Sequence, residues 1–281
     1  MAEVRRRRRA LVALAYAACG VVVFLTALTA TFPYAQTLNR MLNPAGLRLA
    51  SAAQNWNPPF GARFSDVYVV ARHGSGLPPL MQSRRVTVVP ALVASLLGSR
   101  GVRVTADAYG GVVHLRARET GSSTGLEFDA HALRLDRYPL LNMYGGRVFG
   151  LVTATGRADL FAGDFDANTA DVHAEITGFA VTVVHGMPAI GFGRIAATAR
   201  LKDGVLTLAE LNNSGGDVAL SAEGTVSLAP KITDSELNIR FTIVAQPDAP
   251  PHIKLLESIL PPTRGREPHV ITGTIGAPLL G

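Results

Sequence analysis

The acidic residues between positions 164 and 175 have the spacing closest to that of a metal site. Asp164, Asp166 and Asn168 alternate, and Glu175 stands at the twelfth position, as in a calcium-binding loop. Such a loop needs glycine at its sixth position and a helix on each side. Thr169 occupies that position here, and the flanking residues alternate as strands do. We therefore predict a polar β-turn and no metal site.

Two glycine motifs resemble a catalytic turn and a nucleotide turn. Gly121 to Gly125 spells the nucleophile-elbow pattern around Ser123, but the elbow needs a strand that enters a helix. Here the motif joins two alternating segments. Gly191 to Ala196 resembles a dinucleotide-binding turn, yet no βαβ unit surrounds it. Both motifs are predicted to be ordinary turn or strand glycines.

The remaining reactive side chains are isolated. The seven histidines are scattered singly, without the spacing of metal ligands, and Cys19 is the only cysteine. Cys19 lies within a long apolar run, where it packs as a small residue. We predict no catalytic residue, no cofactor and no metal, so the chain is not expected to be an enzyme.

The positive charge is concentrated at the start of the chain. The net charge is +6, from 27 basic and 21 acidic residues. Arg5, Arg6, Arg7, Arg8 and Arg9 are five of those bases and Glu3 is one of the acids, so 22 bases and 20 acids remain. The rest is nearly neutral, which argues against a nucleic-acid partner.

An uncharged run follows these arginines directly. Residues 10–32 contain no charged side chain, and 23 residues at 1.5 Å each cross a hydrocarbon core of roughly 30 Å. We predict a transmembrane helix here, with residues 1–9 as a cytoplasmic basic tail by the positive-inside rule. Residues 33–281 then lie on the far side of the membrane. A cleaved signal peptide is the alternative.

Beyond the predicted membrane span, a short helix leads into a β-rich region. Residues 33–43 have helical spacing, after which apolar residues recur at every second position. Gly110-Gly111, Asp203-Gly204 and the segment 214–217 are predicted hairpin turns. The fold class is therefore mainly β: an antiparallel β-meander, as a curved sheet or a sandwich, with a few short helices. The alternating segments include 126–130, 172–176, 179–183, 218–228 and 237–243, with a possible subdivision near residue 145.

Alternation predicts one dry face for this β domain. Five apolar residues represent that face: Val104, Phe128, Val181, Leu220 and Phe241. Two arrangements fit the pattern. The residues either line an apolar groove that holds lipid acyl chains or pack against one another as an ordinary sandwich core.

Several segments of the chain resemble protein N of the type II secretion system, a family related to AsmA-like envelope proteins. They are Gly101 to Val113, Ala199 to Leu228 and the ending Ile271 to Pro278, in that order after the Phe32-Pro33-Tyr34 junction. The resemblance covers most of the chain and implies an accessory subunit of a secretion apparatus at the bacterial inner membrane, with residues 33–281 as its periplasmic domain. Other envelope or secretion-system proteins are then its expected partners. The AsmA-like alternative implies a lipid-binding or lipid-transfer protein with membrane lipid as its partner.

Overall fold

The computed structural model describes most of the chain after residue 33. The described residues are 34–42, 47–58, 61–71, 79, 81–91, 100–121, 123–139, 147–161, 166–182, 188–229, 234–253 and 268–281. Within them, no helix has the length and apolar character needed to cross a membrane. The arginine run, the predicted membrane span at 10–32 and the possible boundary near 145 lie outside the described residues.

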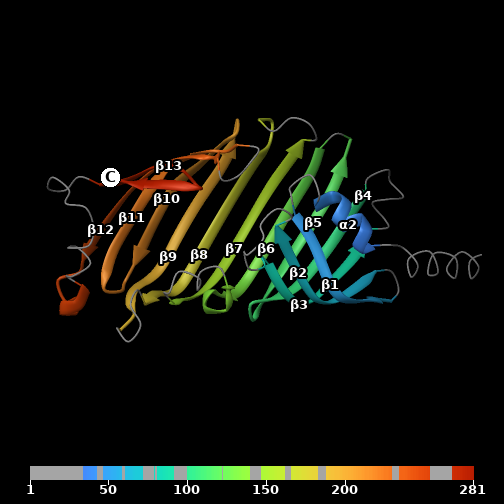
Figure 1. Cartoon of the computed structure of the whole chain (residues 1–281), viewed down its shortest axis with the longest axis horizontal. Coiled ribbons are helices and arrows are strands. Elements are labelled where there is room, and N and C mark those ends of the chain that lie inside the picture. The colour runs from blue at the N-terminus through green and yellow to red at the C-terminus, as the bar shows by residue number, and fades with distance from the viewer. Residues whose placement is uncertain are drawn as a thin grey trace, which may run out of the picture.

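The described chain forms one antiparallel sheet of 14 strands, which lie side by side in sequence order (Figure 1). The mainly β prediction is confirmed, and the sheet has the topology of an uninterrupted meander. The strands are β1 (Leu47–Trp56), β2 (Ala62–Ala71), β3 (Met81–Pro90), β4 (Arg100–Ala108), β5 (Gly111–Thr120), β6 (Ser123–Arg134), β7 (Arg147–Phe161), β8 (Thr169–Thr182), β9 (Ile190–Lys202), β10 (Val205–Ser214), β11 (Val218–Ser227), β12 (Glu236–Ala245), β13 (His269–Thr274) and β14 (Ala277–Leu280). All of the described strands belong to this single sheet.

Short turns join neighbouring strands at, or within one residue of, the predicted positions, since the turn predicted at Gly110-Gly111 begins one residue earlier. Tyr109 and Gly110 turn the chain between β4 and β5, and both have positive φ angles, of 51° and 83°. Asp203 and Gly204 do the same between β9 and β10, with φ angles of 51° and 72°. Two consecutive positive φ values match the right-handed strand twist, so these turns hold the strands in register.

The segments that begin at residues 172 and 179 belong to one strand, although the alternation is broken between them. Strand β8 pairs with β9 along Ala170 to Val181, and its register shifts between Ile176 and Phe179. Gly178, with φ of 64°, lies in that irregularity. The extra residue keeps Ile176 and Phe179 on one face, as a β-bulge does.

The N-terminal end of the sheet curls over (Figure 1), and buried side chains form a small core there. Helix α2 (Tyr34–Leu42) lies there, and its residue Tyr34 is buried with Phe64 and Val67 of β2 and Val88 of β3. Phe64 is 0% exposed. The predicted short helix is therefore confirmed, and it covers the dry face at this end only. The 3-10 helices η2 (Leu135–Arg137) and η5 (Pro251–Ile253) are the other described helices.

Candidate docking surfaces

Strand register places the apolar residues of β3 to β13 on one face of the sheet. Val88, Val104, Leu115 and Phe128 are successive cross-strand partners. A neighbouring row of mostly small residues runs further across the sheet: Ala106, Val113, Ala130, Ala154, Ala174, Ala197, Leu211, Ala222, Phe241 and His269. This surface is called the apolar face below.

The five residues predicted for the dry face lie on the apolar face but not in one cluster. Val104 packs against the N-terminal core. Phe241 stacks on His269, with 5.2 Å between ring centroids. Val181 is opposite Val148 and Ile190, and Leu220 is opposite Ile243. All five are partly buried, so they line a continuous face without forming a closed core among the described residues.

Phe128 is the fifth residue predicted for the dry face, and its ring packs against a glycine. Its cross-strand neighbour on β7 is Gly156. A Cβ added to Gly156 would overlap atoms Cε1 and Cζ of the Phe128 ring and lie 3.0 Å from the carbonyl oxygen of Asp171. Glycine at this position therefore leaves the space that the aromatic ring occupies.

The opposite face carries a row of charged residues with nearly alternating sign. Its successive cross-strand partners are Arg103, Arg116, Glu127, Arg157, Asp171 and Arg200. This surface is called the polar face below. Arg200 donates to Asp171 through Nε at 2.7 Å, and that hydrogen bond raises the pKa of Arg200. Both side chains are exposed, so such pairs favour strand register more than they add stability.

A second ion pair on the polar face involves an acid from the calcium-like motif. Arg194 donates to Glu175 at 2.6 Å, and this hydrogen bond lowers the pKa of the carboxyl group. Asp166 and Asn168 are also described, in and beside a turn before β8. Asn168 accepts a hydrogen bond from the backbone of Phe161. Among the described residues, no group of three His, Cys, Asp or Glu side chains has metal-binding geometry.

The two glycine motifs lie where strand and turn glycines were predicted. Residue 121 is in the turn between β5 and β6, and Ser123 begins β6. The Oγ of Ser123 donates to the carbonyl oxygen of Thr120 at 3.2 Å. Gly191 and its neighbours belong to β9. Neither motif has the strand-to-helix geometry of its catalytic or nucleotide-binding counterpart.

The two terminal strands of the sheet differ in whether other residues cover their outer edges. At β1, the side chain of Asn39 from α2 donates to the carbonyl oxygen of Leu49 at 3.0 Å and accepts from its N–H at 2.7 Å. This amide pairs with the strand as a further strand would, so it blocks the edge locally. Alternation alone did not reveal this contact, because it joins a helix to a backbone position.

At the other end, β14 is exposed along its whole length. Leu279 is 65% exposed and Leu280 is 48% exposed. Leu280 is opposite Ile271 of the apolar face, whereas Leu279 is opposite Thr272 on the polar side. The four residues of β14 include no polar side chain, so this strand is apolar on both faces.

The described fold thus offers three surfaces: the apolar face, the charged polar face and the doubly apolar strand β14. The charged row on the polar face exists because the strands pair in one particular register. The exposure of β14 follows from its position at the end of the sheet. Neither feature could be predicted from sequence motifs, because both depend on the order of the strands. Comparison of the chain with family models, curated proteins and solved structures found no match.

Proposed function

We propose that this chain is a non-enzymatic inner-membrane accessory subunit of the type II secretion system, and that its periplasmic domain docks on other envelope proteins through β14. The observation that carries the docking surface is the character of β14, a terminal strand with exposed leucines on both faces. Strands that are apolar on both faces are typical of positions covered on both sides. A partner protein supplies that cover.

Side chains, more than backbone hydrogen bonds, make this contact. Gly281 and Val270 exchange two backbone hydrogen bonds, so alternation along β14 turns the polar backbone groups of Leu280 and Pro278 outward. Pro278 has no N–H to donate, which discourages unspecific strand addition. Leu279 and Leu280 then supply the apolar area that a partner buries.

The secretion-subunit assignment rests on the sequence resemblance. Its blocks correspond to three separate parts of the sheet. Gly101 to Val113 covers most of β4 and the start of β5, Ala199 to Leu228 covers the end of β9 with β10 and β11, and Ile271 to Pro278 covers most of β13 and the first half of β14. The uncharged run at 10–32 would hold this sheet beside an inner-membrane machine.

Substitution of Leu279 tests the proposal in a bacterium that lacks its own copy of the gene. The full chain is expected to restore secretion of a type II substrate, and Leu279→Glu is expected to reduce it while the protein level stays unchanged. A charge in an apolar contact weakens association by about tenfold or more. Val244→Glu is the matched control, because Val244 is 50% exposed but lies on the inner strand β12. Equal secretion from both variants would exclude β14 as the docking surface.

The orientation is tested separately with a C-terminal reporter that is active only in the periplasm. The intact chain is expected to give an active reporter. Replacement of Arg5 to Arg9 by glutamine is expected to lower that activity, because these charges keep the N-terminus in the cytoplasm. A silent reporter with all five arginines present would contradict the proposed topology.

Lipid handling is the second candidate, and the apolar face favours it. In the described part of the chain, Ile253 of η5 packs on that face against Ile190 and Val218, but no helix or second sheet packs over its middle. Acyl chains therefore have access to Phe128 and to the partly buried Leu220. A photo-crosslinker at Leu220 is expected to capture lipid in cells if this function holds. A probe at Glu223, on the opposite face of β11, is the control. Only intramolecular products from Leu220 would exclude it.

A further inference from the structure

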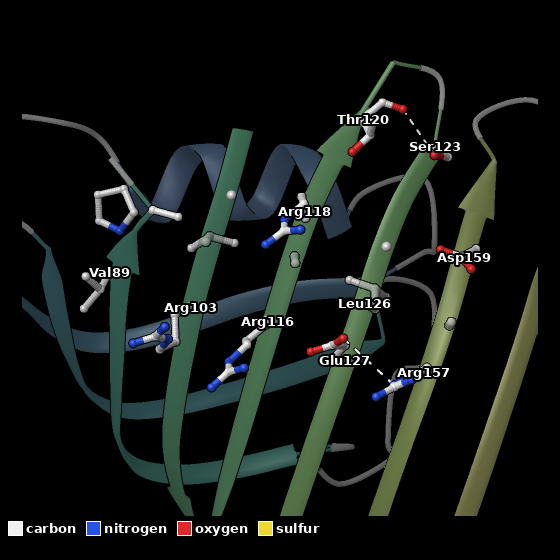
Figure 2. A pocket seen from close by; sticks show the side chains of 17 residues that line it. Val89, Arg103, Arg116, Arg118, Thr120, Ser123, Leu126, Glu127, Arg157 and Asp159 are labelled. Atoms are coloured by element: carbon white, nitrogen blue, oxygen red, sulfur yellow. Dashed lines mark hydrogen bonds and ion pairs between the residues drawn. The ribbon is translucent and has the colours of Figure 1, made fainter. Parts of the chain in front are cut away.

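Three arginines gather on the polar face beside one another, although Glu127 is the cross-strand neighbour of Arg116 on the other side. Arg103 of β4 is directly opposite Arg116 of β5, and Arg118 follows two residues later on the same face (Figure 2). Among the described residues, these three side chains have no ion-pair partner. Like charges directly opposite each other destabilise a sheet, so an anion that neutralises them is favoured.

Two glycines on the neighbouring strands leave a hollow beside these guanidinium groups. Gly101 and Gly125 are the cross-strand neighbours of Arg118, and neither has a side chain to cover it. The resulting cavity has a volume of about 910 Å³ and extends along the strand ends. The hydroxyl groups of Thr120 and Ser123 also line it, and Figure 2 shows them at the upper end of the strands.

The acids in the cavity do not compensate the positive charge. Four arginines and two acids line it: Arg103, Arg116, Arg118, Arg157, Glu127 and Asp159. Glu127 lies 3.9 Å from Nε of Arg157, so this carboxylate is shared with a fourth arginine. The lining therefore keeps a net charge of +2, with three unpaired guanidinium groups on adjacent strands.

We propose that this cavity binds a phosphate group. Guanidinium groups recognise phosphate through paired, nearly parallel N–H donors, and a phosphate offers enough acceptor oxygens for several arginines together. The Thr120 hydroxyl is a further donor at the rim, whereas that of Ser123 already donates to the carbonyl oxygen of Thr120. A phosphate carried by a soluble metabolite and a phosphate in a lipid headgroup share this chemistry. The proposal is independent of the docking role of β14.

Titration of the full chain with pyrophosphate tests the site. The protein is placed in nanodiscs of phosphatidylcholine at physiological salt, and binding is followed by calorimetry. Saturable binding is expected, and Arg116→Gln is expected to weaken it about tenfold or more, because hydrogen bonds to a charged group are lost. Arg240→Gln is the matched control, as Arg240 is an exposed arginine on β12 outside the cavity.

A second variant closes the hollow while keeping every arginine. A Cβ at Gly125 would make only ordinary contacts, 3.4 Å from Oδ1 of Asp159 and 3.8 Å from the carbonyl oxygen of Arg118. Gly125→Gln is therefore expected to fold and to weaken pyrophosphate binding about as strongly as Arg116→Gln. The proposal is overturned by an absence of saturable binding, by unchanged affinity in these two variants, or by an equal loss in Arg240→Gln.

A competition experiment identifies the source of the phosphate. Nanodiscs that contain phosphatidylglycerol are compared with nanodiscs of phosphatidylcholine alone. A lower apparent affinity for pyrophosphate in the first case, abolished by Arg116→Gln, means that a lipid headgroup occupies the cavity. Equal affinity in both means that the site takes a soluble phosphate compound.

Discussion

At the scale of single residues, exposed charges and small side chains determine how neighbouring strands fit together. Gly156 leaves room for the ring of Phe128 on the apolar face, and Arg194 pairs with Glu175 on the polar face. The first contact is a packing constraint and the second is electrostatic. They therefore respond to different perturbations, which makes each one testable alone.

The packing constraint predicts a specific coupling between two positions. Gly156→Ala is expected to lower the free energy of unfolding by about 1–3 kcal/mol, because the new methyl group overlaps the ring of Phe128. Phe128→Leu in the same chain is expected to relieve part of that loss. Urea denaturation of the two single variants and the double variant gives the coupling energy.

Thr155→Ala is the control for this cycle, since Thr155 precedes the glycine and is exposed on the polar face. Its effect is expected to stay within about 0.5 kcal/mol. Strictly additive losses in the double variant would contradict the proposed contact between Gly156 and Phe128.

The electrostatic contact predicts how Glu175 titrates. The hydrogen bond from Arg194 lowers the pKa of Glu175, so its carboxyl group should titrate at a lower pH than an ordinary glutamate when followed by carbon NMR. A lowered folded pKa gives stability that is present above the unfolded pKa and is lost as pH falls through the folded value.

Arg194→Gln is expected to move the midpoint of Glu175 up towards that of an ordinary glutamate, and high salt is expected to move it in the same direction. Arg200→Gln, which removes the neighbouring pair with Asp171, is the control. A midpoint that is insensitive to Arg194→Gln would show that the ion pair does not form in solution.

At the scale of elements, helix α2 protects one end of the sheet. Asn39 makes two hydrogen bonds to the backbone of Leu49, and Tyr34 of the same helix enters the N-terminal core. An edge strand without such cover is a site for unwanted pairing. The helix therefore acts as a cap for β1, while β14 at the opposite end has no equivalent among the described residues.

This cap predicts a local change in amide exchange. Asn39→Ala is expected to speed hydrogen exchange at the Leu49 amide and to reduce stability by about 1–3 kcal/mol, since two hydrogen bonds are lost. Gln36→Ala is the control, because Gln36 is exposed on the same helix. Unchanged exchange at Leu49 in Asn39→Ala would contradict the capping role.

The turns and the short helix could be predicted from the sequence, because each depends on residues that are close together in the chain. Alternation and paired turn residues located the hairpins at Gly110 and Gly204, and helical spacing located α2, because each signal lies within a few residues. The charge row that joins Arg103 to Arg200 was not predicted, since it depends on the register of six strands. The three-arginine cavity was missed for the same reason. The position of β14 as a terminal strand likewise follows only from the strand order of the whole sheet.

At the scale of the whole molecule, the sheet is long, open and different on its two faces (Figure 1). With 14 strands spaced at about 4.8 Å, it extends over roughly 60 Å. Under the proposed function, this length suits a local role beside the inner membrane more than a bridge across the envelope. We propose that helix α2 caps the sheet at β1, that β14 docks on a partner protein and that the polar face binds a phosphate group.

Photo-crosslinking in cells from position 279 tests the central claim, docking through β14, most directly. A photo-reactive amino acid replaces Leu279 in one strain and Val244 in a matched strain, and mass spectrometry identifies the attached molecules. The account predicts a component of the secretion apparatus attached at position 279 and not at position 244. The absence of a protein adduct at position 279, or the same adducts at both positions, would contradict it.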